Sequence, residues 1–536
     1  MTLKGNYALP SLLSCQISLM VGAAQGFSAI LLPQLLDPKS SEHITQSQAS
    51  WIVSLGMICR PMGVLIEGII VDKYGRKIAM QIVTFFFIIS WLFTALSDSL
   101  TILYASRMFL SFTMENTDFN FYFDKSRILL RKFATKSISD SKIKMEGKYN
   151  FINYSINHQQ KTDNRFDRTG SIFSDKLYLS DLDLQRGKIN DLEEQKLNLG
   201  TRTRGMVICV GLYIAEITSP EDRGTFLSLI TPTINIGILL VYFLGYLFHW
   251  KIVACILAVY SIIIFFCLHY IPESHVWFML KHRRTEAIAV LQKLRNDDLD
   301  VVQAELDEIR KRMYWYERNS NTSYFKNFTQ PSAWKPFVIL SIFSLLQQQA
   351  GYNIIIYYAT IFFADMQSSI QNHYLLSILF AIISTFGSVL LLFIVHKYNR
   401  KSLLTFSGIS MAVAIGTAAV VLSIPSLHEI SWLPIISVFA YIFFCMLGMI
   451  DIPWMMIGEL FPNYLRGIMS ALITVVIFFF SFLNLKLYSF MRDWLGFAGN
   501  LWVFAAFSLV SVCFAKIFFP ETKGKPLSEI EKYFEK

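Results

Sequence analysis

The stretch QQQAGYN, residues 347–353, lies within an apolar run that extends from about 337 to 363. An amide buried in hydrocarbon without a hydrogen-bond partner costs roughly 4–8 kcal/mol, so these side chains must face a protein interior or water. On a helix, Gln348, Tyr352 and Asn353 share one face, and amides both donate and accept hydrogen bonds. Such a face suits a hydroxyl-rich ligand. The alternative is hydrogen bonding between helices, worth about 0.6–2 kcal/mol for each bond. The clustering of amides with a glycine and tyrosines favours the ligand site.

The composition places the chain among polytopic membrane proteins. Of its 536 residues, 54% are hydrophobic and 16% are charged, whereas soluble domains average about 25% charged residues. The net charge of +9 comes from basic residues in loops between apolar runs, which argues against a nucleic-acid-binding surface. No catalytic triad, metal-ligand cluster or phosphate-binding loop is evident, so we expect neither an enzyme nor a cofactor or metal.

Apolar runs long enough to cross a bilayer, roughly 20 residues each, recur along the whole chain. They lie at 11–35, 51–70, 79–97, 101–112 continued at 205–217, 225–248, 252–271, 336–363, 374–395, 403–424, 432–458, 467–490 and 499–519. These runs form two sets of six, as two related bundles would. Lysine and arginine gather in alternate loops, so the positive-inside rule predicts that both termini lie in the cytoplasm.

The composition also predicts the domain boundaries. The parts are an N-terminal bundle (1–112 and 205–272), a polar insert (113–204), a linker (273–335), a C-terminal bundle (336–520) and a tail (521–536). Amphipathic patterns in the linker predict a small cytosolic helical domain. The insert carries both charge signs without periodicity, which indicates disorder. It interrupts the fourth apolar run, where a solvated segment would expose backbone groups to hydrocarbon. The hypothesis that we favour is translated intron sequence, and the alternative is a genuine regulatory loop.

The polar stretch in the seventh run resembles the seventh-helix signature of sugar porters in the major facilitator superfamily. The positions that match that signature are Gln347, Gln348, Gly351, Asn353 and Tyr358. Ala350 and Tyr352 replace its usual serine and isoleucine. The resemblance implies an all-α membrane protein with twelve transmembrane helices in two six-helix bundles, the major facilitator fold, and a sugar site lined by these residues.

A pair of charged residues occurs once in each half of the chain. Glu216 with Arg223 ends the fourth run, and Glu459 with Arg466 ends the tenth, at the same seven-residue spacing. This internal repeat is typical of two related halves. The family pattern implies cytoplasmic salt bridges that close an inner gate. A surface pair contributes only about 0–1 kcal/mol, which suits a gate that breaks on every cycle.

The loops after the second and eighth runs belong to the same gate in the family pattern. Residues 72–77, DKYGRK, carry the motif, and Asp72 and Arg76 are expected to join neighbouring helix ends. Residues 396–401, HKYNRK, keep Arg400 but lack the carboxylate and the glycine. Asparagine tolerates the left-handed conformation that glycine favours, so we expect the turn to persist.

Further residues in the apolar runs complete the sugar site that the resemblance implies: Trp454, Asn235 and Ser384. The tryptophan lies in a run that glycine and proline loosen, and it can stack on a sugar face. Asp451 is a charge in the same run, and we expect it near the extracellular water. Arg60 is similarly unexpected in the second run, and the sequence offers no account of it.

Coupling and substrate class follow from the resemblance. Proton-linked members carry an aspartate in the first helix where this chain has Ser28, which cannot titrate near neutral pH. Facilitated diffusion is therefore favoured over proton symport. Lys486 and the C-terminal signature resemble insect facilitated trehalose transporters and their hexose-transporting relatives.

We therefore expect facilitated transport of trehalose or a hexose by alternating access, through a multi-pass protein of the plasma membrane that works as a monomer. The expected partners are the sugar and the lipid bilayer, with no nucleic acid. The alternatives are a proton-coupled sugar symporter and a non-transporting sugar sensor. Sugar binding without flux would identify the sensor.

Overall fold

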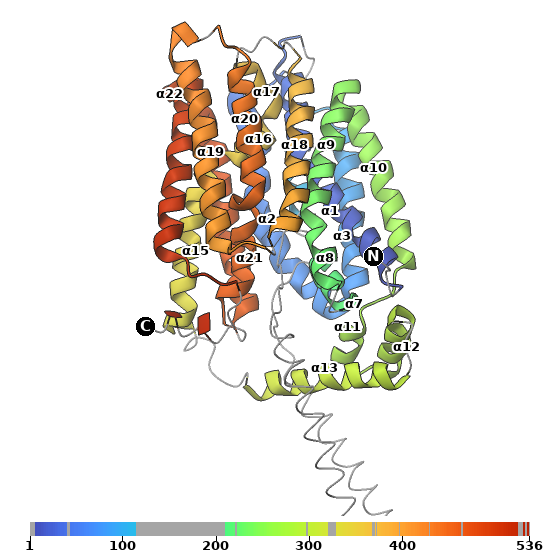
Figure 1. Cartoon of the computed structure of the whole chain (residues 1–536). Helices are drawn as coiled ribbons and strands as arrows, with labels where there is room; N and C mark the ends of the chain where they lie inside the picture. Colours follow the sequence, from blue (N-terminus) through green and yellow to red (C-terminus); the bar gives the residue numbers. More distant parts are fainter. Residues whose placement is uncertain are drawn as a thin grey trace, which may run out of the picture. The chain divides into compact units, whose positions relative to one another are not determined.

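The computed structural model describes residues 6–39, 43–113, 209–219, 222–295, 299–319, 328–366, 370, 372–395, 397–427, 429–462, 465–523, 529–530 and 533–534. In this part of the chain, all regular structure is helical (Figure 1), which confirms the all-α prediction. Apart from Thr113, the predicted insert lies outside the described residues.

The first six membrane spans form the N-terminal bundle. Its elements are α1 (Ala8–Leu36), α2 (Gln46–Tyr74), α3 (Arg76–Ala95), α4 (Leu100–Thr113) with α7 (Cys209–Ile217), α8 (Arg223–Ser228) with α9 (Ile230–Leu247), and α10 (Trp250–Cys267) with the 3-10 turn η2 (Leu268–Tyr270). The fourth span is thus built from two helices. At the start of α7, Glu67 of α2 accepts a hydrogen bond from the backbone N–H of Cys209 at 3.2 Å. This carboxylate supplies an acceptor to a helix start that lacks one within its own helix.

Three helices follow the N-terminal bundle: α11 (His275–Leu280), α12 (Arg284–Arg295) and α13 (Leu299–Asn319). Their apolar faces enclose a small core that includes Leu291 and Leu306. Arg295 ties this unit to the bundle, because its guanidinium donates to the carbonyls of Ile217 and Thr218 at 3.0 and 3.1 Å. We call the end of the helices where α11, α12 and α13 lie the linker end (Figure 1), and the opposite end the far end.

The last six spans form the C-terminal bundle. Its elements are α15 (Pro331–Gln349), α16 (Tyr352–Tyr357), α17 (Ala359–Asp365), α18 (His373–Ile394), α19 (Arg400–Ser423), the 3-10 turn η3 (Pro425–Leu427), α20 (Leu433–Phe444), the π-helical turn η4 (Cys445–Met449), α21 (Asp451–Leu460) and α22 (Arg466–Phe518). α22 contains two spans that meet at Gly496, where φ is 70°.

By length and hydropathy, nine helices in the described part of the chain are able to cross a membrane. That number counts α22 once although it holds two spans, and it omits the interrupted fourth span (α4 and α7) and seventh span (α15, α16 and α17). The helices therefore fit the predicted twelve-span architecture.

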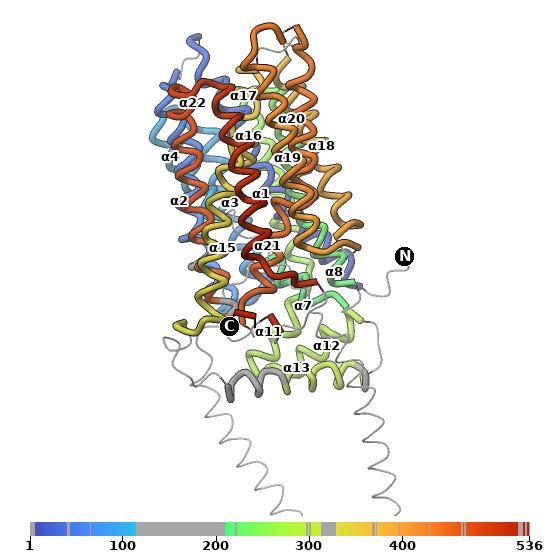
Figure 2. Tube along the Cα trace, turned by 60° about the vertical axis from the view of Figure 1, so that its left-hand side comes forward, coloured from blue at the N-terminus to red at the C-terminus, as the bar shows by residue number. Residues whose placement is uncertain are grey.

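Close helix packing within and between the bundles positions the central cavity. α1 crosses α9 where a glycine of each helix faces the backbone of the other: a Cβ on Gly22 would lie 1.9 Å from the carbonyl oxygen of Ile234. Only glycine permits this approach of two backbones. Between the bundles, α2 packs along α22 (Figure 2) and α9 along α18 (Figure 1).

The seventh span is broken within residues 347–353. α15 ends at Gln349, and Gly351 has φ of 97° before α16 begins at Tyr352. A Cβ at Gly351 would lie 2.6 Å from the ring of Phe504. Glycine is thus required here both by backbone conformation and by space.

We expect Gly351→Ala to destabilise the protein, because it combines a strained left-handed backbone with a steric clash against an aromatic ring. Each effect alone is worth about 1 kcal/mol or more. The thermal unfolding midpoint of the purified protein should fall by several degrees. Gly416→Ala is the matched control, since a Cβ there has its nearest neighbour at 3.8 Å. An equal fall in both variants would contradict this account.

Candidate functional site

A cavity of about 100 Å³, partly open to solvent, lies between the two bundles. Its walls come from both halves of the chain. The N-terminal bundle contributes Gln25, Met57, Arg60, Thr231, Ile234 and Asn235. The C-terminal bundle contributes Gln347, Gln348, Tyr352, Asn353, Tyr357, Ile450, Asp451, Trp454, Ile477, Phe478 and Ser481.

The structure brings most of the predicted binding residues together. Gln347, Gln348, Asn353, Trp454 and Asn235 all line the cavity. The Asn353 amide donates to Gln348 Oε1 at 2.6 Å and to Ser481 Oγ at 3.1 Å, which holds both amides against the wall. The Gln347 amide donates to the carbonyl of Met449 at 2.7 Å. These bonds leave part of each amide's capacity for a ligand, because an amide offers two donor hydrogens and two acceptor lone pairs.

Two predicted binding residues do not line the cavity. Ser384 lies behind Asn235 and donates to its Oδ1 at 3.1 Å, so it orients the amide. Tyr358 packs against Tyr488, with ring centroids 5.2 Å apart. The neighbouring Tyr357 lines the cavity instead, and its hydroxyl accepts from Arg60 Nη2 at 2.8 Å.

The cavity wall also carries charged residues whose place the sequence did not predict. Asp451 was expected near the extracellular water, but it is only 3% exposed and lines the cavity. Its Oδ1 accepts from Thr231 Oγ1 of α9 at 3.2 Å. Arg60 also lines the cavity, and its guanidinium lies 5.2 Å from the centroid of the Phe478 ring. An ionisable residue within an apolar run was the available signal for both positions.

Several hydrogen bonds join the two bundles toward the far end. Tyr242 donates to the carbonyl of Ile356 at 2.7 Å, and Thr360 donates to that of Ala29 at 2.8 Å. Nearer the far end, Lys486 Nζ lies 2.9 Å from Ser50 Oγ and 3.9 Å from the centroid of the Trp51 ring. These contacts hold the two bundles together between the cavity and the far end.

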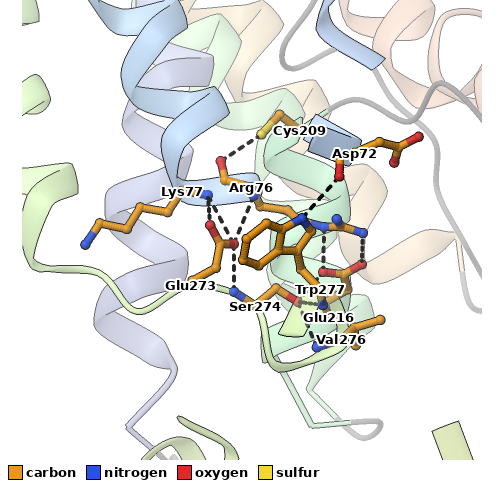
Figure 3. A network of polar contacts seen from close by, with 9 residues as sticks. All are labelled: Asp72, Arg76, Lys77, Cys209, Glu216, Glu273, Ser274, Val276 and Trp277. Carbon is orange, nitrogen blue, oxygen red and sulfur yellow. Dashed lines mark hydrogen bonds and ion pairs between the residues drawn. The ribbon is translucent and has the colours of Figure 1, made fainter. Parts of the chain in front are cut away.

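A buried polar network connects helix ends of the N-terminal bundle at the linker end (Figure 3). The Arg76 guanidinium donates to both carboxylate oxygens of Glu216, at 3.0 and 2.8 Å, and Ser274 also donates to Glu216. Glu273 accepts from the backbone N–H of Arg76 at 2.9 Å. The carbonyl of Asp72 accepts from Trp277 Nε1 at 3.3 Å. Helices α2, α3, α7 and α11 are thereby fixed to one another.

The C-terminal bundle repeats this arrangement more loosely. Arg400 pairs with Glu459 at 3.8 Å, and Glu521 accepts from the backbone N–H groups of Arg400 and Lys401 at 3.2 and 3.1 Å. Asn399 has φ of −69°, so the predicted left-handed turn is wrong. Where the first loop has Gly75 with positive φ, this loop has Asn399 in an extended conformation just before α19.

The carboxylates of the charged repeat pair with arginines of the preceding loops, Glu216 with Arg76 and Glu459 with Arg400. The repeated spacing identified the right carboxylates, but the pairing arises between helix ends distant in sequence. Arg223 is the first residue of α8, and the side chain of Arg466 lies outside the described part of the structure.

His275 begins α11 beside this network and is 1% exposed. Burial lowers the pKa of its imidazole to about 4, with the nearby Glu305 opposing the shift and Arg295 and Arg223 adding to it. The histidine is therefore neutral in the folded protein at physiological pH.

The family model described as "Sugar (and other) transporter" matches residues 16–114 and 200–534. The chain belongs to this family. The match leaves out most of the predicted insert, as expected for a segment added to a family member.

Curated proteins similar to this chain include facilitated trehalose transporters of insects. The chain is 29% identical over 336 residues to the "Facilitated trehalose transporter Tret1" of Anopheles gambiae, covering 61% of this chain and 42% of that protein. It is 30% identical over 339 residues to the "Facilitated trehalose transporter Tret1-2 homolog" of Drosophila sechellia, covering 60% and 68%. The chain thus spans about two fifths of the length of the Anopheles gambiae relative.

Solved structures confirm the fold. The inward open xylose transporter XylE from E. coli has a TM-score of 0.67 at 17% identity, covering 98% of this chain and 99% of that chain. A partially occluded inward open form of XylE also has a TM-score of 0.67, at 16% identity and 96% and 98% coverage. The predicted major facilitator architecture is therefore confirmed.

Neutralising Glu216 should destabilise the protein more than neutralising Glu459, its counterpart in the C-terminal bundle. Removing one partner of a buried, hydrogen-bonded ion pair costs about 3–5 kcal/mol. The Arg400–Glu459 pair, at 3.8 Å, is too long for a hydrogen bond, so it has less to lose than the Arg76–Glu216 pair. We expect Glu216→Gln to lower the thermal unfolding midpoint of the purified protein clearly more than Glu459→Gln. Equal shifts would show that the looser pair is no weaker.

His275 should make stability depend on pH. Its pKa is about 4 in the folded protein, below the value of about 6.5 for an unfolded chain, so its contribution is complete above pH ~6.5 and is lost as the pH falls toward ~4. The loss is on the order of 3 kcal/mol. The unfolding midpoint of His275→Gln should fall less over this range than that of the wild type. Parallel curves for the two proteins would exclude His275 as the source.

Proposed function

We propose that this protein carries a sugar, trehalose or a hexose, across the plasma membrane by alternating access. The observation that carries the proposal is the set of amides that both bundles direct into one cavity. Gln347, Gln348, Asn353 and Asn235 offer donors and acceptors suited to sugar hydroxyls, and Trp454 offers a ring to stack on a sugar face. The relatives named as facilitated trehalose transporters support this substrate class.

In this proposal, Ser384 acts through Asn235, which it hydrogen-bonds. Tyr358, which packs on Tyr488, supports the far-end half of the seventh span near the Asp365–Arg492 ion pair of 2.5 Å. Neither residue touches the sugar directly. The far-end contacts between the bundles break when the protein opens at the far end. The sugar site is then reached from the far end and no longer from the linker end.

The residues proposed for the inner gate lie at the linker end: Asp72, Arg76, Glu216, Arg223, Arg400, Glu459 and Arg466. Their networks hold the helix ends of each bundle together, so each bundle rocks as a unit. We assign this end, with both termini, to the cytoplasm on the strength of its lysine and arginine content. The predicted division into two bundles, insert, linker and tail is part of the same proposal.

The coupling proposed is facilitated diffusion. Ser28 Oγ accepts a hydrogen bond from Arg107 Nη2 at 2.5 Å, so a neutral hydroxyl stands where proton-linked family members place a carboxylate. A hydroxyl cannot load and release a proton near neutral pH. This contact supports uniport over proton symport.

Uptake of radiolabelled trehalose and glucose into oocytes tests the proposal, with surface protein measured in parallel. We expect Gln348→Ala to lower uptake on the order of tenfold, because a hydrogen bond to the sugar is worth about 1–1.5 kcal/mol. Gln349→Ala is the matched control, since Gln349 accepts from Asn484 and does not line the cavity. Surface protein that binds sugar without uptake would instead identify a sensor.

The same assay addresses the insert, by comparison of the full chain with one that joins Phe112 directly to Gly205. Uptake by the joined chain alone would support the hypothesis that 113–204 is absent from the mature protein. Uptake by the full chain would establish an accommodated loop, with Glu67 capping the resumed helix at Cys209.

A further inference from the structure

Asp451 occupies an unusual position at a helix break inside the cavity. It is the first residue of α21 and follows the π-helical turn η4 after one residue. A π-helical turn adds a residue to the helix and often marks a functional site. Here the carbonyl of Met449, in that turn, accepts from the Gln347 amide at 2.7 Å. The broken tenth span is therefore joined to the seventh span beside the cavity.

The carboxylate of Asp451 is only half satisfied within the protein. Oδ1 accepts from Thr231 of the other bundle at 3.2 Å. Oδ2 is buried and has no hydrogen-bond partner among the described residues. The residue is 3% exposed and lines the cavity. A buried acceptor without a donor is costly, and a ligand in the cavity that Asp451 lines can supply the missing donor.

The surroundings favour an acceptor of hydroxyl groups over a site for a cation. Arg60 lines the same cavity, so a positively charged substrate would meet a like charge. A neutral polyhydroxyl ligand supplies O–H donors without that repulsion.

We propose that Asp451 is a specificity-determining residue of the sugar site, whose Oδ2 accepts the hydrogen of one hydroxyl group of the bound sugar. The proposal rests on the sugar-binding function proposed above and deepens it. A hydrogen bond from a hydroxyl to a carboxylate is roughly twice as strong as one between neutral groups. A site built around such a bond rejects the analogue that lacks the hydroxyl, because the buried oxygen is then left unpaired.

The proposal also gives the contact a place in the transport cycle. Thr231 belongs to the N-terminal bundle and Asp451 to the C-terminal bundle, so the bond between them crosses the surface along which the bundles move. A sugar hydroxyl on Oδ2 keeps the carboxylate supplied with a donor when the Thr231 bond breaks. A sugar that carries this hydroxyl therefore stabilises the intermediate between the two orientations of the bundles better than a sugar that lacks it.

The test is sugar binding by the purified full chain, with glucose, trehalose and the set of monodeoxy glucoses as probes. We expect wild-type protein to bind glucose on the order of tenfold more tightly than one monodeoxy analogue. In Asp451→Asn, that single preference should fall below about twofold, while preferences at the other hydroxyls remain. Thr231→Val, which removes only the donor to Oδ1, should keep the preference.

Two results of the binding test overturn the inference. The first is an unchanged deoxy preference in a folded Asp451→Asn protein, and the second is an equal loss of preference at every hydroxyl. Uptake measured at several pH values adds a third. If wild-type uptake accelerates as the pH falls and Asp451→Asn abolishes this dependence, the carboxylate carries a proton and the inference is wrong.

Failure of the inference and failure of the proposed function give different results. Wild-type protein that shows the Asp451-dependent deoxy preference but no uptake supports the inference and removes the transport function. Uptake by the wild type with an unchanged deoxy preference in Asp451→Asn removes the inference and leaves transport. Absence of both sugar binding and uptake in the wild type removes both.

Discussion

Hydrocarbon offers no hydrogen-bond partner, so every polar group that this protein places within the membrane must be satisfied by the protein itself. Many serines and threonines meet this requirement inside their own helix, as when Ser344 donates to the carbonyl of Leu340 at 2.7 Å. The amides Gln347, Gln348 and Asn353 of the seventh span do not, and they gather instead in the cavity between the bundles. The cavity is thus where the constraint is relaxed, because water or a ligand can complete the hydrogen bonds there.

The same constraint explains the breaks in the helices. A break frees backbone groups, and at two of the breaks a polar side chain bonds to them. Glu67 supplies the acceptor at Cys209. In the tenth span, Ser407 Oγ donates to the carbonyl of Phe444 at 2.7 Å and accepts from the N–H of Met449 at 2.9 Å. Irregular backbone is therefore found where neighbouring helices can satisfy it.

The spans and the cavity amides were predictable from sequence, because apolar runs and misplaced polar residues are local signals. Details of the cavity wall were not. Successive helical residues differ by about 100° in direction, so a break such as Gly351 decides whether Tyr357 or Tyr358 faces the cavity. The π-helical turn has the same effect on Asp451. Ion pairing was hidden for another reason: Arg76 and Glu216 are 140 residues apart, and only the packing of their helix ends brings them together.

The connection inside α22 has a consequence for how the bundles move. The eleventh span packs on α2 of the opposite bundle, and the twelfth continues from it through the single turn at Gly496, with no intervening loop. A longer loop between two helices allows one helix to slide while its neighbour stays in place. The eleventh and twelfth spans have no such loop between them. Because a single turn joins the two spans, a displacement of the far end of the eleventh span at the bundle interface also displaces the far end of the twelfth.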